Sequence, residues 1–393
     1  MRKFLAAMRN HPPIAVELWD GERITACKGP PEVVLHIKSR GALWGIVTNP
    51  DLYFGDAYIV GAVEVEGRLL RLIELASNNR PDFIKESTWF GKLMGLVAGA
   101  PRVNTPEDAI ENIHHHYDVS NEFYQLWLDR DHMQYTCAYY DHPDATVEEA
   151  QTAKLHHVCR KLRLKPGDRV LEAGCGWGGL ARFMAREYGA HVRAYNISHQ
   201  QLVFARDKAR AEGLDELVEY READYRDATG EYDVFVSVGM LEHVGKANYR
   251  ELGGVVDRCL TAEGRGLIHT IGRNRPRVMN RWIEKRIFPG AYPPTLGEMS
   301  EIFEPYDFSV LDVENLRLHY ERTLDDWRQC FEASRDTVRE MFDERFVRAW
   351  RLYLEGSIHA FRNGDLQLFQ IVFQRGRNND VPWTREHLYR HDR

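Results

Sequence analysis

The chain has 393 residues, of which 44% are hydrophobic, and its formal net charge is −7. This length predicts two domains with a large core, and the acidic balance argues against a nucleic-acid partner, because non-specific binding to nucleic acid requires basic surfaces. The six cysteines contain no CxxC pair, so we expect free thiols in a reducing, cytoplasmic compartment and no metal or disulfide site. No apolar run approaches the roughly 20 residues that span a bilayer, and the N-terminus is too short and interrupted for a signal peptide.

The first part of the chain mixes strand-like and helical patterns. Asp20-Gly21 is a turn signal between two short strands. A further strand is expected over 32–38 and a helix over 69–76. We therefore predict a smaller α+β domain at residues 1–100, followed by a linker at 101–110. The apolar run 89–99 is too short to cross a membrane, so it is expected to pack between domains or to lie on lipid.

From about residue 107 strands and helices alternate, which is typical of a parallel sheet covered on both faces. Thr146 and Glu149 form a capping-box signal, which predicts a helix that ends near residue 162. We expect residues 111–393 to form an α/β domain with a doubly wound, seven-stranded sheet, in which the last two strands pair as an antiparallel hairpin. The expected strands are 169–172, 191–197, 218–223, 232–239, 266–271, 308–313 and 366–373.

The stretch Arg169–Gly179 is the most informative part of the chain. It predicts a short apolar strand that ends at Glu172, then a glycine-rich loop, then a helix that begins at Leu180. Closely spaced glycines such as Gly174 and Gly176 let the backbone approach a ligand that a Cβ would repel. This loop is typical of class I methyltransferases, which bind S-adenosylmethionine (SAM) on a Rossmann-like sheet. A dinucleotide-binding loop and a tight turn without a ligand are the alternatives.

Further residues at the ends of the next strands are candidates for binding the same cofactor. An acidic residue commonly ends the second strand and holds the ribose hydroxyls, but this chain has Asn196 there, with Gln201 one helical turn on. An amide both donates and accepts, so these two side chains are predicted to bind the ribose. Asp224 can accept a hydrogen bond from the adenine amino group and Tyr225 can cover the ring face, although Asp224 can also simply cap a turn.

Four short segments carry candidate catalytic groups: 133–140, 237–245, 267–272 and 318–323. Glu242 and His269 fall at the carboxyl rim of the predicted sheet, where ligands bind in such folds. Each residue alone is a weak signal, because a lone buried cysteine such as Cys137 is more often inert packing. The joint placement of the four segments is what indicates a site.

Through these segments the chain resembles the cyclopropane-fatty-acyl-phospholipid synthases, which are related to the mycolic acid cyclopropane synthases. The resemblance runs from about residue 110 to 376, and more loosely over the front of the chain. The pair of motifs GMLEHVG and HTIG is highly specific to this family. The matching segments are 116–121, 134–139, 172–179, 238–245, 269–272 and 366–373.

The resemblance implies the activity, the cofactors and several site residues. It implies transfer of a methylene group from SAM to the cis double bond of an unsaturated phospholipid acyl chain. It implies a bound bicarbonate ion held by catalytic groups, and positions near the methionine end of SAM at Tyr135 and Thr136. Some relatives carry a further active-site cysteine where this chain has Ser357, which leaves the role of residue 357 open. The implied catalytic set is Cys137, Glu242, His269, Tyr320 and the backbone of Ile271.

The implied chemistry accounts for these residue types. An alkene is a weak nucleophile, so it attacks the sulfonium methyl only when both are held in line without water, which is worth about 7–11 kcal/mol in favourable cases. The resulting carbocation must lose a proton from the new methyl group before the ring closes. Bicarbonate can take that proton in a dry pocket, while Glu242 either orients His269 or takes the proton onward.

Two further segments bear on how lipid is reached. Aromatic residues recur at helical spacing from Phe342 to Phe361, which predicts either plain core or the wall of an acyl tunnel. Residues 271–288 mix six basic residues with Trp282 and other apolar residues, which predicts either a surface helix that docks on lipid or a solvated lid. The resemblance thus implies an accessory, lipid-binding role for residues 1–100 and a cytoplasmic enzyme peripherally bound to the inner face of the membrane. Whether the chain forms a homodimer is left open.

Three alternatives remain at this stage. The carbocation can lose a chain proton or capture water, which would give a methylene, methyl-branched or hydroxy lipid. The chain can methylate a small oxygen or nitrogen nucleophile, in which case Glu242→Gln should leave turnover mostly intact. It can also bind lipid without catalysis, which the intact glycine loop argues against. The sequence does not indicate the preferred headgroup or double-bond position.

Overall fold

The computed structural model describes residues 2–79 and 120–389, which divide into two compact units. The first unit takes in the N-terminal region together with residues 279–289 and 332–360. The second contains the remaining described residues. The predicted linker, the apolar run 89–99 and the first four residues of the motif 116–121 lie outside the described residues.

The first unit is built on a four-stranded sheet with the order β2-β1-β3-β4. As predicted, a turn at Asp20-Gly21 joins β1 to β2, and Gly21 has a φ of +83°, which favours glycine. β1 and β3 are parallel, and the outer strands are antiparallel to them. The elements of this unit are α1 (Arg2–Ala6), β1 (Ile14–Leu18), β2 (Arg23–Thr25), β3 (Val33–Ile37), α2 (Arg40–Thr48), α3 (Pro50–Ile59), β4 (Val63–Glu66), α4 (Leu69–Asn78), α14 (Arg281–Arg286), α17 (Arg335–Met341) and most of α18 (Glu344–Arg362).

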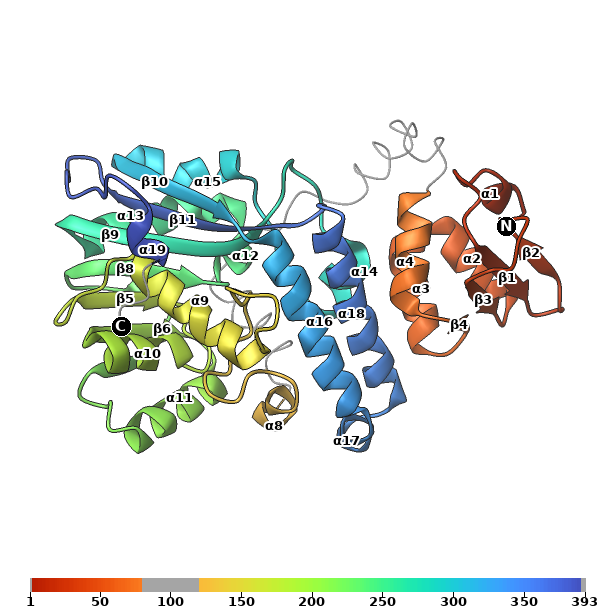
Figure 1. Cartoon of the computed structure of the whole chain (residues 1–393), viewed down its shortest axis with the longest axis horizontal. Helices are drawn as coiled ribbons and strands as arrows, with labels where there is room; N and C mark the ends of the chain where they lie inside the picture. Colours follow the sequence, from red (N-terminus) through yellow and green to blue (C-terminus); the bar gives the residue numbers. More distant parts are fainter. Residues whose placement is uncertain (1, 80–119, 390–393) are drawn as a thin grey trace. The chain divides into compact units, whose positions relative to one another are not determined.

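The second unit contains the predicted seven-stranded α/β sheet, with the order β10-β11-β9-β8-β5-β6-β7 (Figure 1). Strand order reverses between β5 and β8, and in such sheets ligands bind at the carboxyl ends beside that point. Its strands are β5 (Arg169–Ala173), β6 (His191–Asn196), β7 (Val218–Glu222), β8 (Tyr232–Val238), β9 (Leu260–Gly272), β10 (Phe308–Asn315) and β11 (Gln367–Arg375). Its helices are α8 (Asn121–Gln125), α9 (Val147–Lys161), α10 (Gly179–Tyr188), α11 (His199–Ala211), α12 (Leu241–Val244), α13 (Tyr249–Cys259), α15 (Leu296–Phe303), α16 (Arg317–Ala333) and α19 (Glu386–Tyr389).

Two strand predictions require correction. β10 and β11 are antiparallel as expected, but they are not a hairpin, because α16, α17 and α18 lie between them in the chain. β9 begins at Leu260, six residues before the predicted start at Gly266, because its first residues continue the ladder with β8 past a register shift between Tyr232 and Val234. The capping box at Thr146 and Glu149 is confirmed.

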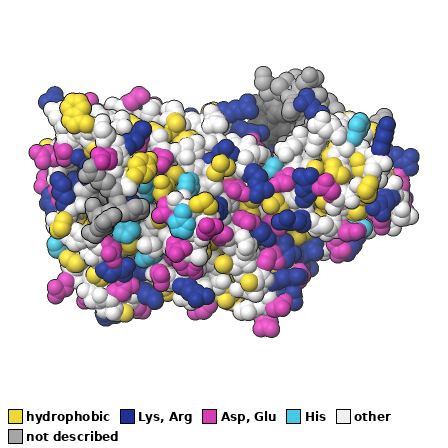
Figure 2. All heavy atoms as spheres, in the orientation of Figure 1, with side chains coloured by type: hydrophobic (Ala, Val, Ile, Leu, Met, Phe, Trp, Pro, Cys, Tyr) yellow, Lys and Arg dark blue, Asp and Glu magenta, His cyan; other side chains and the backbone are white. Residues whose placement is uncertain are grey.

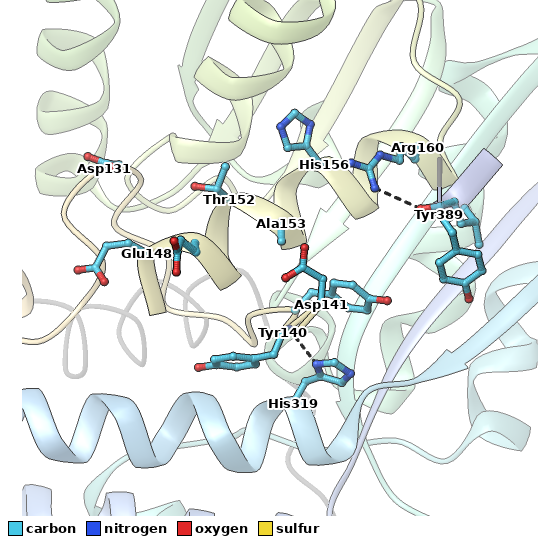
Figure 3. Close-up of a pocket in the computed structure, with 13 residues that line it drawn as sticks. Asp131, Tyr140, Asp141, Glu148, Thr152, Ala153, His156, Arg160, His319 and Tyr389 are labelled. Atoms are coloured by element: carbon cyan, nitrogen blue, oxygen red, sulfur yellow. Dashed lines mark hydrogen bonds between the residues drawn. The ribbon is translucent and has the colours of Figure 1, made fainter. Parts of the chain in front are cut away.

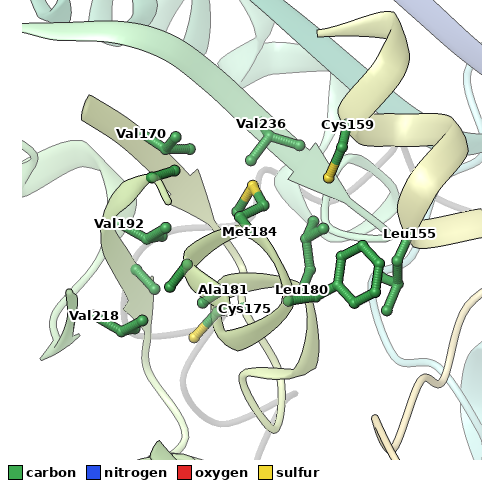
Figure 4. Close-up of a cluster of buried hydrophobic side chains, with 14 of the residues drawn as sticks. Leu155, Cys159, Val170, Cys175, Leu180, Ala181, Met184, Val192, Val218 and Val236 are labelled. Carbon is green, nitrogen blue, oxygen red and sulfur yellow. The ribbon is translucent and has the colours of Figure 1, made fainter. Parts of the chain in front are cut away.

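Helices cover both faces of this sheet, as the strand–helix alternation predicted. On one face α9, α10 and α11 pack on β5, β6 and β8 through a continuous cluster of buried aliphatic side chains, which includes Leu155, Met184 and Val236 (Figure 4). On the other face α12, α13 and α15 form a second cluster with the sheet. The carboxyl ends of the strands are therefore held on a rigid, doubly covered scaffold.

Charged side chains of both signs are interspersed on the face shown in Figure 2, consistent with the modest net charge. In the described ranges, none of the helices combines the length and apolar character needed to cross a bilayer.

Candidate active site

The glycine-rich loop joins β5 to α10 at the carboxyl edge of the sheet. Gly176 has a φ of +53°, and a Cβ built on it would meet no atom within 4 Å, so the space in front of it is open. Gly179 begins α10, and a Cβ there would overlap the carbonyl oxygen of His132. Gly176 thus leaves room for a ligand, and Gly179 lets the loop around His132 pack against the N-terminus of α10.

A cavity lies in front of this loop and brings together six of the predicted cofactor residues. Tyr135 and Thr136 enter it from the loop before α9, and Asn196 and Gln201 enter it from the end of β6 and the start of α11. Gly174 and Gly176 complete the predicted set, and the cavity is further lined by Met133, Gln134, Glu172, Cys175, Trp177, Leu180, Val238, Gly239, Met240 and His243.

Asn196 and Gln201 contact each other directly. The Asn196 side-chain amide donates to Gln201 Oε1 at 2.9 Å and to the carbonyl of Gly176 at 3.2 Å. Both side chains are buried. The two amides therefore act as one polar unit that is tied to the glycine loop.

Asp224 and Tyr225 do not line this cavity. Both carboxylate oxygens of Asp224 accept hydrogen bonds from Arg226, one from its backbone N–H at 2.9 Å and one from its guanidinium at 3.0 Å. Asp224 thereby caps the short 3₁₀ turn Tyr225–Asp227, which is the alternative that the sequence left open. Tyr225 is buried, and the guanidinium of Arg226 lies 5.1 Å from its ring centroid. A role of these two residues in binding adenine stays a prediction.

The loop that carries Tyr135, Thr136 and Cys137 is fixed by buried polar groups. The Asp129 carboxylate accepts from the backbone N–H groups of His132 at 2.8 Å and Gln134 at 2.7 Å. From α9, Gln151 donates to the Thr136 carbonyl at 2.9 Å. Such a network positions the loop before any ligand binds.

Lys154 on α9 also holds this loop, and the sequence analysis did not identify it. Its ammonium group donates to Gln134 Oε1 at 2.5 Å and to Thr136 Oγ1 at 2.9 Å. The side chain is fully buried, and burial lowers its pKa to about 8. A lysine inside a helix gives no sequence signal of this kind, because only the fold shows which face is buried.

Glu242 lies on α12, just after β8, and His269 lies three residues before the end of β9, so both are at the predicted carboxyl edge, and both are buried. Glu242 Oε1 accepts from the Ile271 backbone N–H at 2.5 Å. Among the residues that the structure describes, Glu242 Oε2 and His269 Nε2 have no hydrogen-bond partner. Burial raises the pKa of Glu242 to about 7 and lowers the pKa of His269 well below its usual range, so the imidazole is neutral. Buried polar atoms without a partner are uncommon in proteins, and a bound ligand, ion or water is one way to satisfy them.

Cys137 and Tyr320 meet at the backbone of Leu316. The Cys137 thiol lies 3.9 Å from the Leu316 carbonyl oxygen, which also accepts from the Tyr320 N–H at 3.2 Å. Burial raises the pKa of the Cys137 thiol, so it is a neutral donor rather than a thiolate.

Backbone pairing connects the segment of Cys137 and Tyr320 with the segment of Glu242 and His269. The Leu316 N–H donates to the Leu368 carbonyl at 2.8 Å, and Leu368 pairs with Ile271 across β11 and β9. The Ile271 N–H is already used by Glu242, so Ile271 would share that donor with any anion. Cys137, Glu242, His269 and Tyr320 do not line the cavity in front of the glycine loop. Their catalytic roles stay predictions.

Gly239 connects His269 with the cavity in front of the glycine loop. Its N–H donates to the His269 carbonyl at 2.9 Å, and a Cβ built on it would lie 2.7 Å from Thr136 Cγ2. Gly239 and Thr136 both line the cavity. The predicted cofactor residues that line the cavity are therefore neighbours of His269 at one edge of the sheet.

Glu172 also lines the cavity in front of the glycine loop, although the sequence analysis named it only as the last residue of a strand. It is buried, its pKa is raised to about 8 by burial, and its Oε2 has no partner among the described residues. An acidic residue directly before a glycine loop was the signal available. A buried carboxylate at a cavity wall can pair with a cationic ligand.

A larger cavity of about 630 Å³ lies beside α9 and contains none of the predicted site residues (Figure 3). Its wall includes Asp141, Glu148, Arg160 and His319. His319 Nδ1 accepts from the Tyr140 backbone N–H at 3.0 Å, so its ring helps to fix the loop after Cys137.

The aromatic stripe begins at Phe342, just before α18, continues along that helix and forms a row of ring contacts. Phe342 and Phe346 stack with centroids 4.1 Å apart, and Phe346 stacks on Trp350 at 5.6 Å. Farther along the helix, Phe361 lies 4.6 Å from the ring of Tyr320. Both interpretations of the stripe, core and acyl tunnel, are compatible with this row. Ser357 lies on the same helix.

The segment 271–288 differs from the predicted lipid-docking helix. Only Arg281–Arg286 is helical, and Trp282 and Ile287 are buried within the first unit. The Trp282 ring packs on Gly55 of α3, and Arg286 pairs with Asp56 at 3.0 Å. Trp282 and Ile287, two of the apolar side chains that were expected to face lipid, are thus used for packing, because composition alone does not show which side of a short helix is buried.

Two family profiles match the chain. The profile described as "Mycolic acid cyclopropane synthetase" matches residues 104–371. A domain of unknown function, DUF7884, matches residues 1–88.

Individual relatives and solved structures agree with the first profile. The chain is 39% identical over 398 residues to a probable fatty acid methyltransferase of Pseudomonas putida, which covers 97% of both chains. It is 43% identical over 267 residues to the cyclopropane-fatty-acyl-phospholipid synthase of Escherichia coli K12, which covers 68% of both chains. Among solved structures, the mycolic acid cyclopropane synthase CmaA1 complexed with SAH and CTAB superposes with a TM-score of 0.64 and 29% identity. That match covers 68% of this chain and 98% of CmaA1.

Proposed function

Because the chain belongs to the mycolic acid cyclopropane synthetase family and is a SAM-dependent methyltransferase, we propose that it converts the cis double bond of unsaturated phospholipid acyl chains into a cyclopropane ring. The observation that carries this proposal is the pair of buried, unpaired atoms Glu242 Oε2 and His269 Nε2, beside the cavity of the glycine loop.

The reaction is balanced as follows. The alkene attacks the sulfonium methyl group, a C–C bond forms, the C–S bond breaks and S-adenosylhomocysteine leaves. A proton then departs from the new methyl group, and the electron pair of that C–H bond closes the ring. The protein's tasks are to align the reactants, to exclude water and to hold a proton acceptor.

The residues fit a small anion with one hydroxyl group. His269 offers a hydrogen-bond donor, Tyr320 offers a phenol, and Glu242 offers an acceptor. The Cys137 sulfur lies 3.1 Å from the Ala138 carbonyl oxygen, so its thiol would have to turn its proton away from that oxygen to donate to the anion. When bound there, bicarbonate would supply the acceptor for the methyl proton. Glu242 in its ionised form would hold the hydroxyl group of the anion and take its proton onward.

The cavity residues fit SAM. Tyr135 and Thr136 would lie near the methionine end, while Asn196 and Gln201 would bind the ribose. The positive charge of the methionine ammonium group would favour ionisation of Glu172, whose unpaired oxygen would then pair with it.

We also propose that the N-terminal region docks on an anionic phospholipid surface through α2. No residue of α2 is buried, although its sequence is RGALWGIVT, and Trp44 and Val47 are 71% and 57% exposed. Arg40 at its start lies 5.7 Å over the half-exposed ring of Trp19, and Tyr53 packs on Gly45. Exposed tryptophan beside arginine suits a membrane interface, where the ring enters the headgroup layer and the cation meets phosphate.

Trp44→Ser is expected to weaken sedimentation with vesicles that contain an anionic phospholipid by about tenfold, because burial of a large apolar side chain contributes about 1.5–3 kcal/mol. The matched control is Trp383→Ser, since Trp383 is fully exposed and lies in the second unit. The control should sediment like the wild type. Equal binding of both variants would refute the role of α2.

A methyl-branched product is the second candidate, because a relative that matches nearly the whole chain is described as a probable fatty acid methyltransferase. The test is to incubate the enzyme with SAM and vesicles of cis-unsaturated phospholipid and to identify the fatty acids by mass spectrometry and NMR. A ring-containing acid with one added CH₂ and no double bond supports the proposal. A methyl-branched or hydroxylated acid would contradict it.

A further inference from the structure

Gln370 on β11 lies directly opposite His269 on β9, and the two side chains are joined in the protein core. The register pairs the two residues, and Gln370 Nε2 lies 3.1 Å from His269 Nδ1. Gln370 is completely buried and His269 is 1% exposed. No water competes for this contact.

The chemistry of the amide decides where the imidazole proton resides. An amide nitrogen only donates, so His269 Nδ1 must accept, and the single proton of the neutral ring is then on Nε2. In the observed orientation one N–H group of Gln370 Nε2 faces His269 Nδ1, and Oε1 has no partner among the described residues, whereas in the flipped amide neither N–H group would face the ring nitrogen. Unpaired buried N–H groups are the rarer case in proteins. The observed orientation is therefore favoured.

In this tautomer His269 Nε2 carries the proton and can donate a hydrogen bond. Nε2 has no partner among the described residues and is shielded from solvent, so its N–H is available to a ligand. Glu242 is bonded to the backbone of Ile271, two residues along β9, which places an acceptor on the same strand end. A donor and an acceptor together match an anion that carries one proton.

We propose that Gln370 is a positioning residue, which fixes His269 in the Nε2–H tautomer so that the imidazole donates to the bound anion and does not act as a base. The inference rests on the proposed function, since it assigns a role at the same site. A residue that acts through a neighbour in this way parallels the second-layer partners that set histidine tautomers in other enzymes.

Gln370→Glu tests this directly, because a carboxylate accepts from Nδ1–H and reverses the tautomer. We expect turnover to fall by at least about 100-fold, which is the scale of removing one hydrogen-bond donor that stabilises negative charge in an active site. Gln370→Met removes the hydrogen bond without reversing it, and should cost about tenfold. The matched control is Gln374→Glu, because Gln374 is a second buried glutamine on β11. It should retain turnover and the wild-type tautomer.

The tautomer itself is read from nitrogen-15 shifts of histidine-labelled enzyme without substrate. His269 is identified among the 17 histidines by its absence from the His269→Gln spectrum. We expect a protonated Nε2 in the wild type and a protonated Nδ1 in Gln370→Glu. A wild-type proton on Nδ1, or wild-type turnover of Gln370→Glu, would overturn the proposal. Failure of the proposed function appears separately, as the absence of any ring-containing product from the wild-type enzyme.

Discussion

Glu242→Gln is expected to lower turnover by about 100- to 10,000-fold while leaving SAM affinity close to that of the wild type. Glutamine preserves the shape of the side chain, and its Oε1 can still accept from the Ile271 N–H, so the loop after β9 should stay in place. It cannot take a proton. Turnover is measured by transfer of labelled methyl groups into phospholipid, and SAM affinity by calorimetry.

The pH dependence of this variant is a second readout. Burial raises the pKa of Glu242 from 4.5 in the unfolded chain to about 7. The folded state therefore binds more protons between these values, and the wild type should lose stability relative to Glu242→Gln as pH rises through this window. At pH 8 the variant should be more stable by about 3 kcal/mol, at about 1.4 kcal/mol per pKa unit. Wild-type turnover should rise as Glu242 ionises near pH 7.

Two outcomes would contradict this account of Glu242. Turnover of Glu242→Gln within a few-fold of wild type would favour a simple oxygen or nitrogen methyltransferase. A variant that is both inactive and less stable at pH 8 would indicate a structural role.

Gly176→Ala is expected to reduce SAM affinity at least about tenfold, because its Cβ would project into the open space in front of the glycine loop. The fold should be retained, since no protein atom lies within 4 Å of that Cβ. The left-handed backbone adds a cost of roughly 1–2 kcal/mol. Binding is measured by calorimetry and stability by denaturant unfolding.

The matched control is Gly213→Ala, because Gly213 has a φ of +68° and its Cβ would likewise meet nothing within 4 Å. It follows α11 and does not line the cavity, so it should show the same loss of stability with unchanged SAM affinity. Gly179→Ala should differ from both, because overlap with the His132 carbonyl would displace the loop. Wild-type SAM affinity of Gly176→Ala would refute the assignment of the cavity.

The sheet was predictable because its signals are local. Strands of the second unit alternate with capped helices, and each predicted strand is present within a few residues, apart from the early start of β9. The supposed hairpin of β10 and β11 was wrong because pairing is a long-range property, and three helices intervene without disturbing either strand's pattern. Position in the chain was a poor guide to which strands are joined by a turn.

The candidate site was predictable in part, for a similar reason. Glu242, Gly176 and Asn196 lie at or just after strand ends, and His269 lies near the end of β9, so the fold class itself places them at one edge. Lys154 and Gln370 could not be found in this way, because each acts from the buried face of an element on a residue far away in sequence. The glutamines within the apolar run of β11 were the one available clue, since a buried amide requires a partner.

The central claim is that the enzyme removes a proton from the transferred methyl group and closes a ring. The direct measurement uses SAM with a fully deuterated methyl group and vesicles of a cis-monounsaturated phospholipid, followed by mass spectrometry and NMR of the released fatty acid. The account predicts a cyclopropane that keeps two of the three deuterons. A product that keeps all three deuterons, whether branched or hydroxylated, would contradict it.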